Sequence, residues 1–258
     1  MDLLIMNLSK LKRVFKIKSL SSGNTPKVIF LHIPKTAGTS FARIIENNYS
    51  KSEFYLATAG NVESRQYIMN SLNSFLKLPK REQDKIKIIK GHFPYGLHEK
   101  MNWSDYKYIS FIRNPVERLF SEYYYIKDNP THPLSKLCNE ISFEEYALSD
   151  DYHLQNQQIR MLAGFDALFE TDMHRVYELA IKNVSSENFI LGLTERFSDS
   201  LSMIGKALGW KNVEEQFVRY PSKKPSKMAI DREVLSEIEM KNYWDIKFYE
   251  HISKLFEN

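Results

Sequence analysis

The sequence predicts an α/β domain with three layers, in which helices cover both faces of a central, mostly parallel sheet. Short apolar runs rich in β-branched and aromatic residues alternate with segments whose apolar residues recur at helical spacing. Such alternation is typical of parallel strands joined by crossover helices. The 258 residues are 43% hydrophobic and 26% charged, which suits one buried core and not a disordered chain.

Four segments have the pattern of buried strands: residues 27–33, 85–90, 106–112 and 188–193. Helical spacing begins at Phe41 and marks residues 61–83, 142–150, 153–163, 171–182, 197–208 and most of 231–256. Gly209 is expected to close the helix over 197–208, because glycine tolerates the left-handed conformation that ends many helices.

The clearest helix start follows the third strand. Asn114 can act as the N-cap, Pro115 suits the first helical position, and Glu117 can reach back as in a capping box. The apolar residues that follow keep helical spacing. We therefore expect a helix to begin directly where strand 106–112 ends.

We expect a single domain over residues 25–258, preceded by an N-terminal extension, residues 1–24. The extension is basic, and its apolar residues are spaced as on one face of a helix. An amphipathic helix with weak membrane-surface contact and a frayed terminal helix are the two interpretations. No apolar run approaches the roughly 20 residues that span a bilayer, so no transmembrane segment is expected.

The net charge and the residue composition limit the classes of binding partner that we expect for this chain. A formal charge of +4 suits local anion pockets better than a surface that coats nucleic acid, so no nucleic-acid partner is expected. Cys138 is the only cysteine and cannot form an intrachain disulfide, which favours a reducing compartment. No cluster has zinc-ligand spacing, and no metal is expected.

The stretch HIPKTAGTS, residues 32–40, joins the first strand directly to a helix. That arrangement directs backbone N–H groups and the positive end of the helix at one point, which favours an anion. Lys35 adds a positive charge, Gly38 lets the backbone approach a ligand, and the loop hydroxyls add donors. The stretch is not a Walker A loop, because Lys35 comes early and the first glycine is absent. A turn that merely caps a helix is the alternative.

A second candidate lies in KYISFIRNPVERLFSEYYY, residues 107–125. Arg113 ends a strand, and Ser121 follows in the capped helix. The arginine can offer a planar fork to a phosphate, and the serine a hydroxyl. The alternative is that Arg113 pairs with a carboxylate while Ser121 is simply exposed.

Together these motifs resemble the carbohydrate sulfotransferases that use PAPS (3′-phosphoadenosine 5′-phosphosulfate), and in particular the heparan sulfate 2-O- and 6-O-sulfotransferases. PKTAGTS is similar to their 5′-phosphosulfate loop, and Arg-Asn-Pro with a serine eight residues after the arginine is similar to their 3′-phosphate motif. The resemblance spans roughly residues 28–256 and implies a P-loop-like fold. It implies that Arg113 and Ser121 hold the 3′-phosphate, and that the 5′-phosphosulfate is held by Lys35, Thr36, Ala37, Gly38, Thr39 and Ser40.

Two later segments extend the resemblance. LQNQQIRMLAGF, residues 154–165, is similar to a helix of the 6-O-sulfotransferases and makes substrate-binding candidates of Asn156, Gln158 and Arg160; structural hydrogen bonding is the alternative. The basic loop YPSKKPSK, residues 220–227, occupies the place of a loop that commonly closes over the nucleotide in this family. Its cofactor-binding candidates are Ser222, Lys223, Lys224 and Lys227, and a solvated basic loop is the alternative.

Sulfuryl transfer needs a base for the acceptor hydroxyl, and histidine, with a pKa near 6.5, suits that role. His92 follows a strand and Gly91, where α/β sheets place their chemistry. The segment KGHFPYG also resembles the one that holds the catalytic histidine in glycan 2-O-sulfotransferases. His98 is the runner-up, because the 6-O-sulfotransferases carry a Gly-Leu-His at a similar place.

The resemblance therefore implies in-line transfer of a sulfuryl group from PAPS to a hydroxyl of a glycan, glycolipid or polysaccharide, with 3′,5′-bisphosphoadenosine (PAP) as product and no metal. His92 would take the proton, and Lys35 would stabilise the leaving phosphate. Protein tyrosine or a small hydroxyl metabolite stays open as the acceptor. A P-loop-like kinase and a non-catalytic nucleotide- or glycan-binding module stay open as other classes. We expect a cytoplasmic, bacterial-type location, or the Golgi lumen for a trimmed eukaryotic enzyme.

Overall fold

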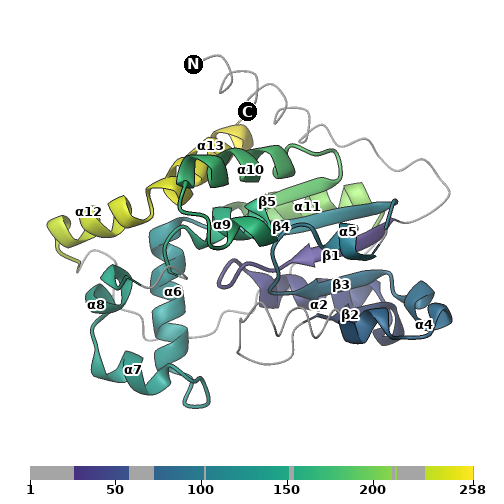
Figure 1. The fold of residues 1–258 in the computed structure, drawn as a ribbon, viewed down its shortest axis with the longest axis horizontal. Helices are drawn as coiled ribbons and strands as arrows, with labels where there is room; N and C mark the ends of the chain where they lie inside the picture. Colours follow the sequence, from purple (N-terminus) through teal and green to yellow (C-terminus); the bar gives the residue numbers. More distant parts are fainter. Residues whose placement is uncertain are drawn as a thin grey trace.

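The computed structural model of this chain describes residues 26–57, 73–101, 103–150, 154–210, 213 and 230–257. Across these residues it forms a five-stranded parallel sheet in the order β2-β3-β1-β4-β5 (Figure 1). The strands are β1 Lys27–Leu31, β2 Phe54–Leu56, β3 Ile88–Gly91, β4 Tyr106–Ile112 and β5 Phe189–Leu193. The predicted α/β class with a parallel sheet is confirmed.

β1 lies in the middle of the sheet. Val28 pairs with Ile88 of β3 on one side and with Lys107 of β4 on the other. A strand with a neighbour on each side and helices on both faces has no exposed side chain, so it appears in the sequence as a continuous apolar run. β2 was not predicted from the sequence, because it is a three-residue strand, partly exposed, that pairs with β3 at the edge of the described sheet.

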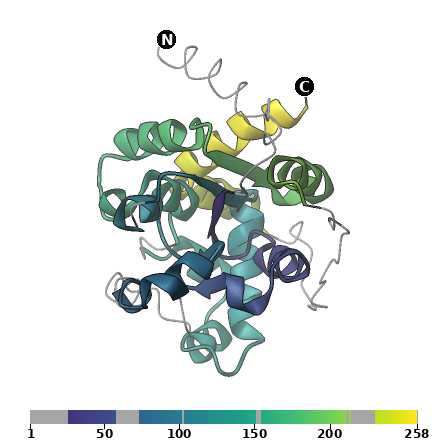
Figure 2. The ribbon, with the colours of Figure 1, turned by 90° about the vertical axis from the view of Figure 1, so that its right-hand side faces the viewer.

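Helices form a layer on each face of the sheet (Figure 2). Val28 and Phe30 of β1 pack against α2 Gly38–Asn48 and α11 Phe197–Leu208. Ile29 and Leu31, which point the other way, belong to a cluster with residues of α5 Leu97–Met101, α9 Gln157–Ala163, α10 Met173–Val184 and α13 Tyr243–Phe256. The alternation of side chains along the strand thus divides the core in two, and the predicted three-layer, P-loop-like fold is confirmed.

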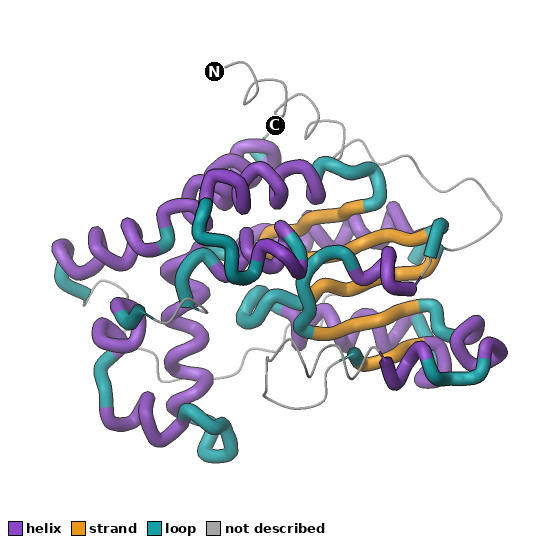
Figure 3. The backbone as a smooth tube through the Cα atoms, viewed as in Figure 1, coloured by secondary structure: helices purple, strands orange, loops and turns teal. Residues whose placement is uncertain are grey.

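The helices that build a third apolar cluster lie beside the sheet rather than on it (Figure 3). Leu119 and Tyr123 of one helix pack there with Phe143, Tyr146 and Ile238. The helices that contribute are α6 Pro115–Lys127, α7 Ser135–Glu140, α8 Phe143–Leu148 and α12 Arg232–Lys241. Since α6 starts directly after β4, this cluster anchors α6 at the carboxyl end of the sheet.

Most predicted helices are present, with three corrections. α4 Lys80–Lys85 begins after Pro79, which interrupts the helix expected over residues 61–83; residues 61–72 lie outside the described part. Asn242 divides the long C-terminal helix into α12 and α13. The Asn114 side chain caps α6 as predicted, but its own amide donates to Glu195 and not to Glu117.

Three single-turn 3-10 helices complete the described elements: η1 Lys51–Glu53, η2 Phe165–Ala167 and η3 Thr194–Arg196. Gly209 ends α11 with a φ of 65°, the left-handed conformation that was predicted for it. None of the described helices is long and apolar enough to cross a membrane. The N-terminal extension and the basic loop 220–227 lie outside the described residues.

Candidate functional site

The loop between β1 and α2 has a backbone geometry that suits an anion. Lys35 and Ala37 have φ values of 66° and 67°, a left-handed conformation that residues other than glycine rarely adopt. Left-handed residues alternating along a turn direct their N–H groups into a shared concavity that binds anions. Ala37 is also the N-cap residue of α2, and its side chain has no acceptor for the N–H groups of the first turn.

Two loop residues hold the loop in this shape. The buried Thr36 hydroxyl donates to the Ile33 carbonyl at 2.8 Å. A Cβ placed on Gly38 would lie 1.7 Å from Nε2 of His32, so the ring of His32 fills the space that a side chain would need. Thr39 is exposed and Ser40 is buried. Packing against His32 therefore requires a glycine at position 38, in addition to the predicted need for the backbone to approach a ligand there.

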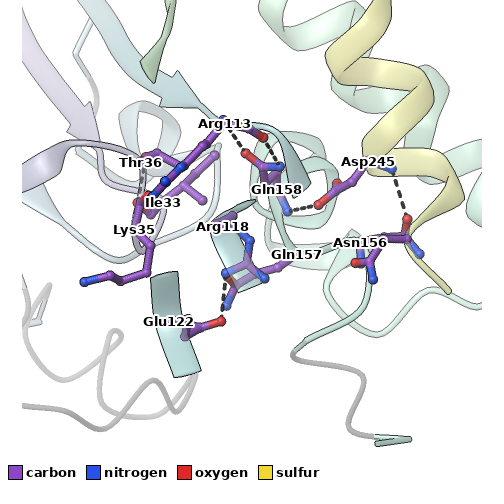
Figure 4. Close-up of polar contacts among 11 residues, drawn as sticks. Ile33, Lys35, Thr36, Arg113, Arg118, Glu122, Asn156, Gln157, Gln158 and Asp245 are labelled. Atoms are coloured by element: carbon purple, nitrogen blue, oxygen red, sulfur yellow. Dashed lines mark hydrogen bonds and ion pairs between the residues drawn. The ribbon is translucent and has the colours of Figure 1, made fainter. Parts of the chain in front are cut away.

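The side chain of Lys35 extends from the loop to α6. Its Nζ lies 3.7 Å from the centre of the Tyr125 ring, within cation–π range. Figure 4 shows this side chain pointing away from Arg113. The loop and α6 are therefore bridged by a charged side chain that is long enough to turn toward a bound anion.

Arg113, at the end of β4, brings the second predicted motif to the first. Its Nη1 donates to the Lys35 carbonyl at 3.3 Å (Figure 4). Its Nη2 lies 3.9 Å from Oε2 of Glu117. Burial lowers the pKa of Arg113, but a guanidinium keeps its charge in proteins. Ser121 is buried on the same helix as Glu117. Two segments nearly 80 positions apart thus meet at one point.

His92 lies next to this loop. Its Nδ1 is 2.7 Å from the carbonyl oxygen of His32, and the two rings are 4.3 Å apart. A carbonyl can only accept, so Nδ1 carries the hydrogen and the neutral ring has its lone pair on Nε2. Burial lowers the pKa of His92, and Lys35 lowers it further, while the hydrogen bond to the His32 carbonyl and the charge of Glu122 oppose this lowering. The ring is therefore neutral near pH 7, the state that a base requires.

His98 lies elsewhere. It is on α5, with Nδ1 3.1 Å from the Tyr108 hydroxyl and its ring 4.4 Å from that of Tyr106. Tyr108 precedes Arg113 by five residues, about 16 Å along an extended strand. The structure thus brings His92, and not His98, to the loop of Lys35.

The third predicted segment makes contacts with the main chain. Oδ1 of Asn156 accepts from the amides of Trp244 and Asp245 at 3.0 Å each. Nη1 of Arg160 donates to the carbonyls of Leu168 and Glu170 at 3.1 and 2.8 Å. These contacts favour the structural alternative for both side chains, and substrate binding by them stays a prediction.

Arg118 of α6 is a buried arginine that the sequence analysis did not single out. It is 1% exposed, and its Nη1 donates to Glu122 at 2.9 Å and to Gln157 at 2.7 Å. Glu122 follows Ser121, and Tyr125 lies one turn further on. Arg118 stands three residues before Ser121 and Tyr125 four residues after it, a spacing that would have placed these two, though not Glu122, on the helix face of Ser121. Among the described residues, no group of three or more His, Cys, Asp or Glu side chains could hold a metal ion.

Comparisons with known proteins cover most of the chain. A family model described as "Sulfotransferase family" matches residues 22–251. The chain is 25% identical over 194 residues to the heparin sulfate O-sulfotransferase of Drosophila melanogaster, which covers 70% of this chain and 55% of that protein. It is 21% identical over 265 residues to heparan sulfate 2-O-sulfotransferase 1 of Xenopus laevis, covering 89% and 70%. The chain thus spans about half the length of the fly relative.

Solved structures are more distant. One is a mouse sulfotransferase complexed with PAP, at 14% identity and a TM-score of 0.43, covering 92% of this chain and 70% of that chain. Another is a sulfotransferase from Alicyclobacillus acidocaldarius, at 14% identity and a TM-score of 0.46, covering 87% and 94%.

Proposed function

Because the chain belongs to the Sulfotransferase family, we propose that it transfers a sulfuryl group from PAPS to a hydroxyl of a carbohydrate. The observation that carries the proposal is the contact between the two anion-binding segments, where Arg113 Nη1 meets the Lys35 carbonyl at 3.3 Å. PAPS carries phosphate on both sides of one ribose. Two adjacent phosphate sites, one at a helix N-terminus and one at a guanidinium, fit such a nucleotide.

In the proposed reaction, PAPS supplies the sulfuryl group as the donor substrate. Nε2 of His92 removes the proton from the acceptor hydroxyl, and the acceptor oxygen forms a bond to sulfur. The bond between sulfur and the bridging oxygen breaks, and that oxygen leaves with PAP. Lys35 and the N–H groups at the start of α2 stabilise the charge that develops on the leaving phosphate. No proton or electron is left over in this step.

A carbohydrate is the proposed acceptor because the relatives of this chain are named for heparin and heparan sulfate. Protein tyrosine and small hydroxyl metabolites are the competing acceptors. Nothing in the geometry of the described residues favours a kinase, since Lys35 stands early in its loop and not before the terminal hydroxyl, as a Walker A loop requires.

Ligand-dependent thermal stability tests the donor. Bound PAP should raise the melting temperature, because a ligand at a hundred times its Kd adds about 2.7 kcal/mol to the folded state. ATP with Mg²⁺ should give a much smaller shift at the same concentration. A larger shift with ATP and Mg²⁺ than with PAP would reject the sulfotransferase in favour of the kinase.

A further inference from the structure

Gln158 forms two hydrogen bonds with the main chain of one residue. The Arg113 amide donates to Gln158 Oε1 at 2.9 Å, and Gln158 Nε2 donates to the Arg113 carbonyl at 2.9 Å (Figure 4). The ladder between β4 and β5 ends at Ile112, and α6 begins only at Pro115. The Gln158 side chain therefore supplies hydrogen-bond partners for both the amide and the carbonyl of Arg113, a residue that lies between the end of the sheet ladder and the start of the helix.

Gln158 is itself held in place. It is 1% exposed, and its amide and that of Ile159 donate to the Asp245 carboxylate at 3.1 and 2.8 Å. Asp245 belongs to α13, and its own amide donates to Asn156. α13, α9 and the end of β4 are thus connected by hydrogen bonds between buried groups, and the last bond in the series reaches Arg113.

We propose that Gln158 is the positioning residue for the 3′-phosphate site: by fixing both main-chain polar groups of Arg113, it places the guanidinium where the 3′-phosphate of the nucleotide binds. The inference rests on the proposed function and goes beyond it. The side chain of Arg113 is long, so a small change at its main chain moves the guanidinium tip by a larger distance. The tip lies 3.3 Å from the Lys35 carbonyl, close to the loop for the other phosphate. A relaxed strand end would lose that geometry.

The test compares the affinities of PAP and 5′-AMP, which differ only in the 3′-phosphate. In Gln158→Met, which keeps side-chain length and removes both hydrogen bonds, PAP should bind about tenfold more weakly. 5′-AMP should bind within about twofold of the parent. A variant that had merely lost stability would weaken both nucleotides alike, so the ratio separates positioning from damage.

A double-mutant cycle links the effect to Arg113. Arg113→Ala should lower the ratio of the two affinities, and Gln158→Met added to Arg113→Ala should lower it no further. Asn183→Ala is the matched control. Asn183 of α10 donates to the carbonyls of Leu162 and Ala163 at 2.9 and 3.0 Å, and both acceptors belong to α9, the helix of Gln158. The Asn183→Ala variant should leave the ratio of the two affinities unchanged.

The possible outcomes separate a failure of the inference about Gln158 from a failure of the proposed function. If the parent binds PAP no more tightly than 5′-AMP, the proposed function fails. Suppose instead that the parent prefers PAP, that Arg113→Ala loses this preference, and that Gln158→Met keeps it. In that case only the inference about Gln158 fails, and the proposed function stands. Should Gln158→Met not fold, Gln158→Glu carries the same test, because it keeps an acceptor for the Arg113 amide and loses the donor to the carbonyl; an unchanged ratio there overturns the inference.

Discussion

Gly38 and His32 share one small space at the start of α2. The His32 ring lies between Phe30, at 5.3 Å, and His92, at 4.3 Å, so it has little freedom to move aside. Gly38→Ala places a methyl group 1.7 Å from that ring. We expect the variant to be less stable by about 1–3 kcal/mol, as for other overpacked cores.

Urea unfolding of the parent and of Gly38→Ala measures this cost. Thr39→Ala is the matched control, because Thr39 is the next residue on α2 and is exposed. Equal midpoints for parent and Gly38→Ala would show that the His32 ring does not occupy this space.

The two candidate bases give opposite expectations. His92→Gln should lower the transfer rate by about 10²–10⁴-fold, the range of general-base catalysis, with PAP affinity nearly intact. His98→Gln should change the rate little, because its ring is held by Tyr108 and Tyr106 toward the other end of β4. Single-turnover transfer with each variant decides, and a greater loss in His98→Gln would reverse the assignment.

At the residue scale, the sequence identified side chains that stand within short motifs. Lys35 and Arg113 were found because each stands in a segment that joins a strand to a helix, and the structure brings them together. The contact that Gln158 makes was not predictable, because its partner is 45 positions away and no local pattern encodes it. Its motif resemblance suggested substrate binding, whereas its hydrogen bonds lead to Arg113.

At the element scale, α9 depends on a carboxylate from another helix. Asp245 of α13 accepts two amides at the start of α9, and burial raises the pKa of this carboxyl. Asp245→Asn removes the charge and one acceptor oxygen. We expect a loss of about 1–3 kcal/mol in the free energy of unfolding, because a buried amide loses its partner.

Asp199→Asn is the control for that loss. Asp199 forms an ion pair with Arg196 at 2.6 Å, but both side chains are about half exposed, so the change should cost little. If Asp245→Asn unfolds at the same urea concentration as the parent, α9 is stabilised by its packing alone.

The elements themselves were largely predictable. β4 was predicted over its observed residues, because it is buried along most of its length and followed at once by a strong helix start. β2 was missed, since three residues are too few to show a period. The helix over 61–83 was drawn through Pro79, although proline has no N–H to donate within a helix.

At the scale of the whole molecule, the paired histidines make stability depend on pH. Burial lowers the pKa of His92, and burial together with the nearby His92 lowers the pKa of His32 well below 6.5. Below pH 6.5 the unfolded chain therefore binds more protons than the fold, and stability falls as the pH falls. We expect the melting temperature to drop between pH 7 and pH 5.5.

His92→Gln isolates this contribution. The variant has one fewer histidine whose pKa is lowered in the folded state, so its melting temperature should drop less over the same pH interval. An equal drop in parent and variant would mean that His92 is not held neutral in the fold.

The architecture and the family followed from the sequence, and both are confirmed. The strand order and the layer that each helix joins did not, because alternating strands and helices are compatible with several parallel orders. The division of the core into two faces also required the structure, since strands buried on both sides show no alternation of polar and apolar residues.

Transfer of radioactive sulfur from labelled PAPS tests the central claim most directly. The purified chain, incubated with labelled PAPS and a desulfated heparan-type polysaccharide, should release PAP and place the label on the polysaccharide, and His92→Gln should not. Absence of label on that polysaccharide and on a panel of other hydroxyl compounds, with a parent protein that PAP does not stabilise, would contradict the account.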